Sequence, residues 1–185
     1  ECLSRDVLLE ASDRYNTSAI KLEQAIHDAP GWFDRFHHEK MAYIAYIQAS
    51  LTKHVSRDNV VYHGLAGHLL LKNVSHVLKV RIVADMDWRI RIVTERARCS
   101  DSQAAAQITK LDSQRRRWTH DLYGVDPSDP QLYDLMLNLP RLSTDDATDL
   151  ICHVTKRKQF QTTSDSQQEM KDLALRARDG KLMPE

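Results

Sequence analysis

The sequence predicts an α/β domain in which a small parallel sheet is flanked by helices. Three short apolar runs, at residues 60–62, 78–83 and 133–138, have the length and texture of strands, and helical patterns separate them. Strands that alternate with helices form βαβ units, whose strands run parallel. Hydrophobic residues make up 42% and charged residues 28% of the 185 residues, a balance typical of a folded globular chain.

Three helices are predicted before the first strand. Residues 4–15 open with Ser4, a residue type that caps helix N-termini, and carry one apolar stripe. A second helical pattern covers residues 17–30 and ends at a Pro-Gly pair, which stops helices. A third pattern covers residues 38–55, where apolar side chains recur at helical spacing. The first third of the chain is therefore expected to be helical.

Two charged helices, a strand and a further helix are predicted after the second strand. Residues 86–123 contain neither proline nor glycine and read as two helices broken near residues 99–101. Ser143, followed by acidic residues, marks the start of a helix that runs to about residue 158. Residues 161–168 read as a polar linker and 169–181 as a short amphipathic helix. We therefore expect one domain over residues 1–160 and a tail over residues 161–185. The tail is interpreted as the start of another module.

Composition narrows the classes of function and location. Lysine plus arginine equals aspartate plus glutamate at 26 each, so no global basic field attracts nucleic acid. No apolar run approaches the roughly 18–20 residues that a membrane span requires. Three widely spaced cysteines favour a reducing cytoplasm over a disulfide framework. The adjacent histidines at 37–38 cannot both reach one ion from one helix face, and no tetrahedral ligand set completes His63, so no metal site is predicted.

Four stretches, in order and spacing, resemble the cytidylate kinase-like branch of the nucleoside-monophosphate kinases. VVYHGLAGHLLL at 60–71 and VLKVRIVADMDWRIRIVTER at 77–96 are similar to a strand, a glycine-containing nucleotide-binding turn, a second strand and an arginine-bearing lid helix. ITKLDSQRRRWTHDLYG at 108–124 resembles the lid-side helix with its Asp-x-x-Arg pair. DPQLYDLMLNLPRLSTDDATDLI at 129–151 resembles the late strand and helix. The resemblance covers about residues 2–160.

The resemblance implies a three-layer, P-loop-kinase-like fold that transfers the γ-phosphoryl group of ATP, with Mg²⁺, to CMP or dCMP. It implies that Arg89, Arg96 and Arg115 stabilise phosphate charge. It implies that the acceptor is held by a second set of residues, namely Ser4, Arg5, His63, Gly64 and Asp112. In the family, a first strand and phosphate loop precede the segment that matches here, and no G-x-x-x-x-G-K-[ST] motif occurs in the 185 residues. We therefore expect both to be absent from this chain.

Each of these residues also has an ordinary structural interpretation. The arginines of residues 89–98 can form a solvated helix surface with local acidic partners, and Asp112 can form an ion pair with Arg115 one turn away. Ser4 can simply cap a helix, and His63 can be a turn residue without a catalytic role. The family often has arginine where this chain has Leu65, which weakens the kinase reading.

Two rival functions follow from those readings. One is a non-catalytic nucleotide-sensing or scaffold domain of kinase-like fold, favoured by Leu65 and by the absent loop. The other is a nucleic-acid-binding domain that uses the arginines at 115–117, which zero net charge and the lack of interleaved aromatic residues oppose.

Overall fold

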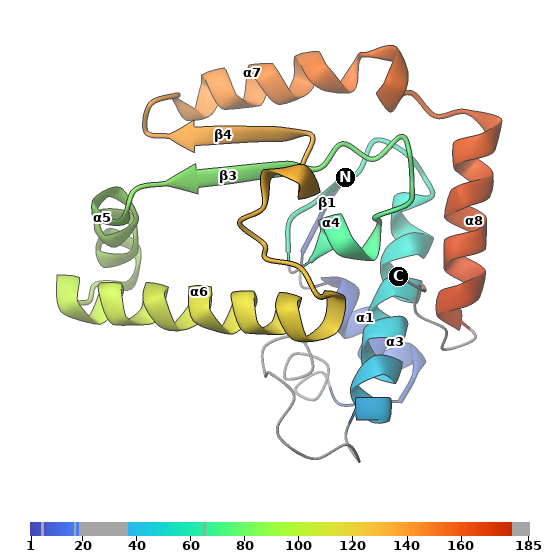
Figure 1. Cartoon of the computed structure of the whole chain (residues 1–185), viewed down its shortest axis with the longest axis horizontal. Coiled ribbons are helices and arrows are strands. Elements are labelled where there is room, and N and C mark those ends of the chain that lie inside the picture. Colours follow the sequence, from blue (N-terminus) through green and yellow to red (C-terminus); the bar gives the residue numbers. More distant parts are fainter. Residues whose placement is uncertain (5, 17, 19–36, 65, 179–185) are drawn as a thin grey trace.

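The computed structural model of the chain describes residues 1–4, 6–16, 18, 37–64 and 66–178, and forms a helix-rich α/β structure (Figure 1). In chain order the main elements are β1 (Cys2–Leu3), α1 (Asp6–Arg14), α3 (His37–Val55), β2 (Val61–Tyr62), α4 (Gly67–Leu70), β3 (Val80–Ala84), α5 (Met86–Ala97), α6 (Asp101–Tyr123), β4 (Leu135–Leu139), α7 (Thr144–Thr155) and α8 (Ser164–Arg178). The helix expected over 17–30 lies outside the described residues. None of the helices in the described ranges is long and apolar enough to cross a membrane.

The strands form two separate parallel pairs rather than one sheet. β1 pairs with β2 in the register Cys2 to Val61, and β3 pairs with β4 from Val80 opposite Leu135 to Ala84 opposite Leu139. The predicted parallel pairing is confirmed, but β2 and β3, the two strands of the expected βαβ unit, are not neighbours. An apolar run in the sequence predicts a strand, but it does not predict which other strand will pair with it. In the described part of the chain, one edge of β3 therefore has no strand beside it.

Helix α3 is the centre of the hydrophobic core. Ile44, Ile47 and Leu51 are each at most 1% exposed, and the polar residues Thr52 and Gln48 are buried beside them. Hydrogen bonds offset part of this burial: the Thr52 hydroxyl donates to the Gln48 carbonyl at 2.9 Å, and the Gln48 side-chain amide donates to the carbonyl of Leu70 at 2.7 Å. The side-chain oxygen of Gln48 has no hydrogen-bond partner among the described residues. A helix buried on this scale takes its stability from tertiary packing.

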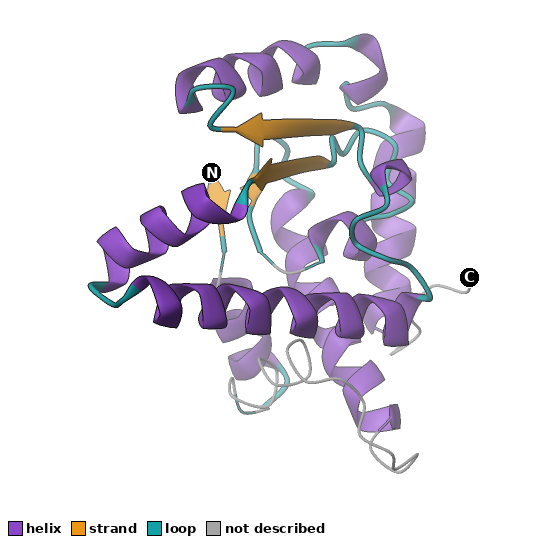
Figure 2. Cartoon of the chain, turned by 60° about the vertical axis from the view of Figure 1, so that its left-hand side comes forward, coloured by secondary structure: helices purple, strands orange, loops and turns teal. Residues whose placement is uncertain are grey.

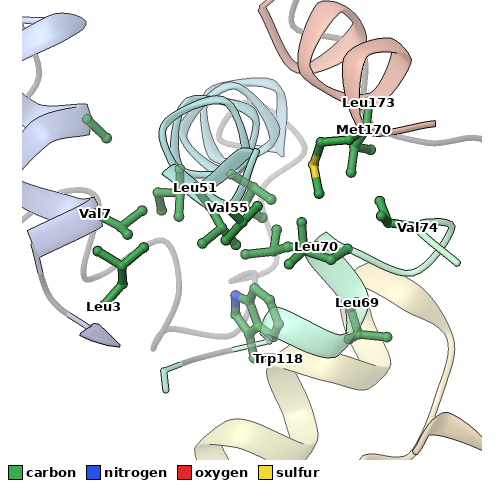
Figure 3. Close-up of a cluster of buried hydrophobic side chains, with 14 residues drawn as sticks. Leu3, Val7, Leu51, Val55, Leu69, Leu70, Val74, Trp118, Met170 and Leu173 are labelled. Carbon is green, nitrogen blue, oxygen red and sulfur yellow. The ribbon is translucent and has the colours of Figure 1, made fainter. Parts of the chain in front are cut away.

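Helices from both ends of the chain pack around α3. Figure 3 shows Leu51 and Val55 of α3 between Val7 of α1 and the side chains of Met170 and Leu173 in α8. Trp118 reaches the same cluster from α6 and is 3% exposed. The core thus connects the first helix, the last described helix and the long helix α6.

Helix α7 runs along β4 on one side of the pair β3–β4, and α6 lies beyond β3 on the other side (Figures 1 and 2). The predicted break between α5 and α6 is confirmed: Arg98 has a left-handed conformation with φ of 52°, and Ser100 caps α6 through a capping box with Gln103. The predicted cap of α7 is also present, since Ser143 and Asp146 form a second capping box.

Helix α8 lies along α3, so the segment expected to form a linker and tail contributes to the core. Two polar contacts hold its approach: Glu169 accepts hydrogen bonds from the backbone N–H and the hydroxyl of Ser75, both at 2.8 Å, and Thr162 donates to Asp58 at 2.8 Å. The division at residue 160 remains a prediction, and in the structure the helix that follows it is docked.

Truncation of a buried leucine in α8 tests this docking. Leu173 is 3% exposed, so Leu173→Ala is expected to lower the free energy of unfolding by about 2–4 kcal/mol, because a cavity opens against α3. Leu175 in the same helix is 56% exposed and provides the matched control, with an expected loss below about 1 kcal/mol. Urea unfolding followed by circular dichroism measures both. Equal losses would show that α8 is not packed as described.

Candidate functional site

A cleft of about 790 Å³ opens between the end of β2, the strand β3 and the helix α6. Its walls include most of the residues that the sequence singled out, namely Ser4, His63, Gly64, Arg89, Asp112 and Arg115. Arg96 is exposed on α5 and is not among the described residues that line the cleft, and Arg5 lies outside the described residues. The ends of β2 and β3 both reach this cleft, which is where α/β proteins bind ligands.

Arg89 of α5 and Asp112 of α6 form a bidentate ion pair inside the cleft. Nη1 of Arg89 donates to Oδ2 of Asp112 at 2.7 Å, and Nη2 donates to Oδ1 at 2.8 Å. The hydrogen bonds from Arg89 lower the pKa of Asp112, and the same pairing raises the pKa of Arg89. Asp112 therefore pairs with an arginine of the neighbouring helix, whereas the sequence suggested a pair with Arg115.

Two further arginines of α6 make the cleft positively charged. Arg115 lines the cleft, and its charge contributes to lowering the pKa of Asp112. Arg116 lies beside it, with its Nε atom 3.9 Å from a carboxylate oxygen of Asp126. Successive positions on one helix thus direct cationic side chains toward the space under β3, where an anionic ligand would be favoured.

The turn after β2 is shaped by two glycines and one tyrosine. A Cβ atom added to Gly64 would lie 2.6 Å from the Tyr62 hydroxyl oxygen, and one added to Gly67 would lie 2.6 Å from Cδ1 of the same ring. The Tyr62 ring therefore occupies the space that side chains at both glycines would need. Burial raises the pKa of Tyr62 to about 12, so its hydroxyl stays protonated at neutral pH. His63 and Gly64 are exposed at the cleft edge.

Sequence analysis missed a cluster formed by Arg81, Tyr133 and His68. The Arg81 guanidinium carbon lies 5.4 Å from the centroid of the Tyr133 ring. The centroids of the His68 and Tyr133 rings are 4.8 Å apart. All three residues line the cleft. The alternation of basic and apolar residues in β3 was the available signal, because a strand directs Arg81 away from the face that carries Ile82. Its partners lie 13 and 52 positions away, so local spacing could not reveal them.

His68 is neutral at physiological pH. Burial, reinforced by the positive charges of Arg81 and Lys79, lowers its pKa to about 4. Its Nε2 atom is 3.4 Å from the Tyr133 hydroxyl, which donates to the Pro127 carbonyl at 2.9 Å. Among the residues that the structure describes, no group of three or more histidine, cysteine or acidic side chains is arranged to hold a metal ion.

Comparison with known proteins gives the family of this chain. The family model described as the cytidylate kinase-like family matches residues 1–141. The chain belongs to the cytidylate kinase-like family. Its relatives in that family include a cytidylate kinase of Sulfolobus acidocaldarius, 32% identical over 103 residues, which are 56% of each chain. A cytidylate kinase of Thermococcus kodakarensis is 32% identical over 80 residues, 43% of this chain and 40% of the relative.

The partial coverage of these relatives and one similar solved structure limit what family membership says about this chain. The chain spans about half the length of the cytidylate kinases that it matches. A solved structure of an uncharacterized protein from Eubacterium ventriosum has a TM-score of 0.57 over 83% of this chain and 96% of that chain, with 16% sequence identity. That likeness concerns the fold alone. A fold similar to that of this chain therefore occurs in a solved structure, and the function of this chain has to be argued from its site.

The ion pair between Arg89 and Asp112 predicts a pH-dependent difference in stability. Because the folded pKa of Asp112 lies below its ordinary value of 3.8, the contribution of the pair is present above about pH 4 and is lost as the pH falls through the lowered pKa. Asp112→Asn is expected to cost about 1 kcal/mol or less at pH 7, since both side chains are about one-third exposed to water. The gap from the parent chain should narrow as the pH falls below about 4, because protonation of Asp112 removes the charge that the pair depends on. Thermal unfolding at pH 7 and at a series of pH values below 4 measures the gap, and a gap that does not narrow over that series would contradict the assignment.

Proposed function

We propose that this chain is part of a nucleoside-monophosphate kinase that transfers the γ-phosphoryl group of ATP to CMP or dCMP. The observation that carries the proposal is the cleft in which Arg89, Asp112 and Arg115 meet the turn after β2, in a member of the cytidylate kinase-like family. Phosphoryl transfer depends on positioning and on positive charge around the transferring group. An arginine-lined cleft at strand ends supplies both.

The proposed roles divide the cleft into two parts. Arg89 and Arg115 stabilise the charge of the transferring phosphoryl group, because planar guanidinium groups match phosphate oxygens. Ser4, His63 and Gly64 line the part of the cleft beside β2, where the acceptor nucleotide is proposed to bind together with Arg5 and Asp112. For Arg96 to join Arg89, helix α5 has to move toward the cleft, as a lid would.

The unpaired edge of β3 supports a site for one more parallel strand. All five residues of β3 line the cleft, and β2, on the far side, pairs only with β1 among the described strands. We propose that a strand from outside residues 1–185 pairs with β3 and joins the two sheets. Its following turn would carry the phosphate loop, whose backbone N–H groups bind the ATP phosphates. Val61 and Ile82, 63% and 56% exposed on the two flanking strands, would be covered by that unit.

The residues present fit a nucleotide better than a resident metal ion. Four arginines and two aspartates line the cleft, and one of those aspartates already pairs with Arg89. Mg²⁺ would therefore enter with ATP, whose phosphates supply most of its ligands when protein carboxylates are few. When bound, it would neutralise charge between the phosphates.

The second candidate is a nucleotide-sensing or scaffold domain without catalysis. The specific observation in its favour is that Arg89 and Asp112 satisfy each other by two hydrogen bonds. In a domain of that kind the pair would stay closed, and nucleotide would bind without turnover. The two candidates differ in whether ATP and CMP are converted to ADP and CDP by a protein that includes the proposed preceding strand.

Thermal unfolding of this chain with CMP tests the acceptor site. At 100 times its dissociation constant, CMP is expected to add about 2.7 kcal/mol to stability and raise the midpoint by several degrees. Cytidine, which lacks the phosphate, should give a much smaller shift. Arg115→Ala should weaken CMP binding about tenfold or more through loss of a charge-assisted hydrogen bond.

The matched control is Arg117→Ala, one charge removed from an exposed position of the same helix that is not among the described residues lining the cleft. It should bind CMP like the parent chain. The assignment of Arg115 would be contradicted if CMP and cytidine raised the unfolding midpoint equally. It would also be contradicted if Arg115→Ala and Arg117→Ala weakened CMP binding equally.

A further inference from the structure

Arg81 carries a buried hydrogen-bond donor that no described residue satisfies. Its Nη1 atom is shielded from solvent and has no hydrogen-bond partner in the described part of the chain. A buried guanidinium N–H without an acceptor is unfavourable, because the group has given up water without replacement. The side chain also lines the cleft, so rotation of its guanidinium would bring this N–H to an acceptor that a ligand in the cleft supplies.

The surroundings of Arg81 hold it in place without neutralising it. Its guanidinium carbon lies 5.4 Å from the centroid of the Tyr133 ring, and Tyr133 is fixed by the hydrogen bond to the Pro127 carbonyl. Asp126 is an acidic residue of the cleft whose pKa is lowered mainly by hydrogen bonds from Ser128, with smaller contributions from the charges of Arg116 and Arg81. Asp126 accepts hydrogen bonds from Ser128 and faces Arg116, so no described carboxylate pairs with Arg81.

The formal charge of the cleft indicates the sign of the ligand. Four arginines against two aspartates leave two positive charges in excess, and the neutral His68 adds none. A planar guanidinium with a free N–H beside further arginines matches the oxygens of a phosphate group.

We propose that Arg81 binds a phosphoryl group of the nucleotide in this cleft, as an anion-binding residue additional to Arg89 and Arg115. The identity of the nucleotide rests on the proposed function, whereas the anion site stands on Arg81 and its neighbours. The interaction is a charge-assisted hydrogen bond, and no covalent bond forms or breaks. A strand side chain projects from the face of its sheet, so Arg81 stays available when another strand pairs with the edge of β3.

Calorimetric titration of the chain with inorganic pyrophosphate tests the site without any base or sugar. Arg81→Met keeps the apolar stem and removes the guanidinium, and it is expected to weaken pyrophosphate binding about tenfold or more. Arg57→Met, at an exposed position outside the cleft, removes the same charge and should leave the affinity unchanged. Pyrophosphate that does not bind the parent chain, or binds Arg81→Met equally well, would overturn the proposal.

A measurement on the parent chain keeps the test decisive if Arg81→Met does not fold. The Nε–Hε resonance of Arg81, followed by nuclear magnetic resonance, is expected to shift progressively during the pyrophosphate titration, because a phosphate oxygen bound to the guanidinium changes the electronic environment of the whole group. An unchanged resonance at saturation would overturn the proposal. Thermal unfolding of ligand-free Arg81→Met shows whether its loss of affinity reflects folding.

Parallel titrations with CMP and ADP identify the source of the phosphate. Weaker binding of CMP to Arg81→Met assigns the residue to the acceptor phosphate, and weaker binding of ADP assigns it to the donor. Pyrophosphate binding that depends on Arg81, together with no binding of either nucleotide, would support the anion site while contradicting the proposed kinase function. The two proposals therefore fail separately.

Discussion

Burial of α3 is the constraint on which the arrangement of the site depends. The core around α3 takes side chains from α1, α4 and α8, and Trp118 ties α6 to the same cluster. Because Trp118 is held there, the preceding turn of α6 is held at the cleft, where Arg115 and Arg116 point toward β3. The apolar face of α6 thus fixes the position of the helix in the core, and this position places the cationic residues of its other face at the cleft.

A second level of order comes from the ion pair that joins α5 to α6. Arg89 and Asp112 are 23 residues apart, and their two short hydrogen bonds close the hairpin of these helices next to the cleft. A bidentate pair has a fixed geometry, so it also fixes the orientation of the guanidinium. A phosphate that binds Arg89 would have to share this arginine with Asp112 or displace the Asp112 carboxylate. A ligand phosphate and Asp112 would therefore compete for the same guanidinium.

The sequence predicted helices and strands better than it predicted their neighbours. Ser143 revealed the start of α7 because capping is a local property, determined within four residues, and the break predicted near residues 99–101 located the start of α6. The pairing of β3 with β4 depends on segments that are far apart in the sequence. No local sequence pattern indicates that β2 and β3 are not paired with each other.

The same distinction holds for the cleft. Most of the residues chosen from the family resemblance line it, because that resemblance carries spatial information that spacing alone lacks. Arg81 was overlooked since its role depends on Tyr133, which joins it only in the folded chain. For Asp112 the sequence offered an ion pair with Arg115 one turn away as an alternative to ligand binding, whereas the packing of α5 against α6 pairs it with Arg89.

The docking of α8 on α3 has a consequence for how the protein is made. Leu3 and Val7 share a core cluster with Met170 and Leu173, so the two ends of the described chain close one apolar surface. During synthesis, α1 and α3 leave the ribosome before α8, the helix that covers the far side of α3, has been made. The nascent chain therefore exposes part of α3 until α8 follows, and chaperones and proteases can engage it during that interval.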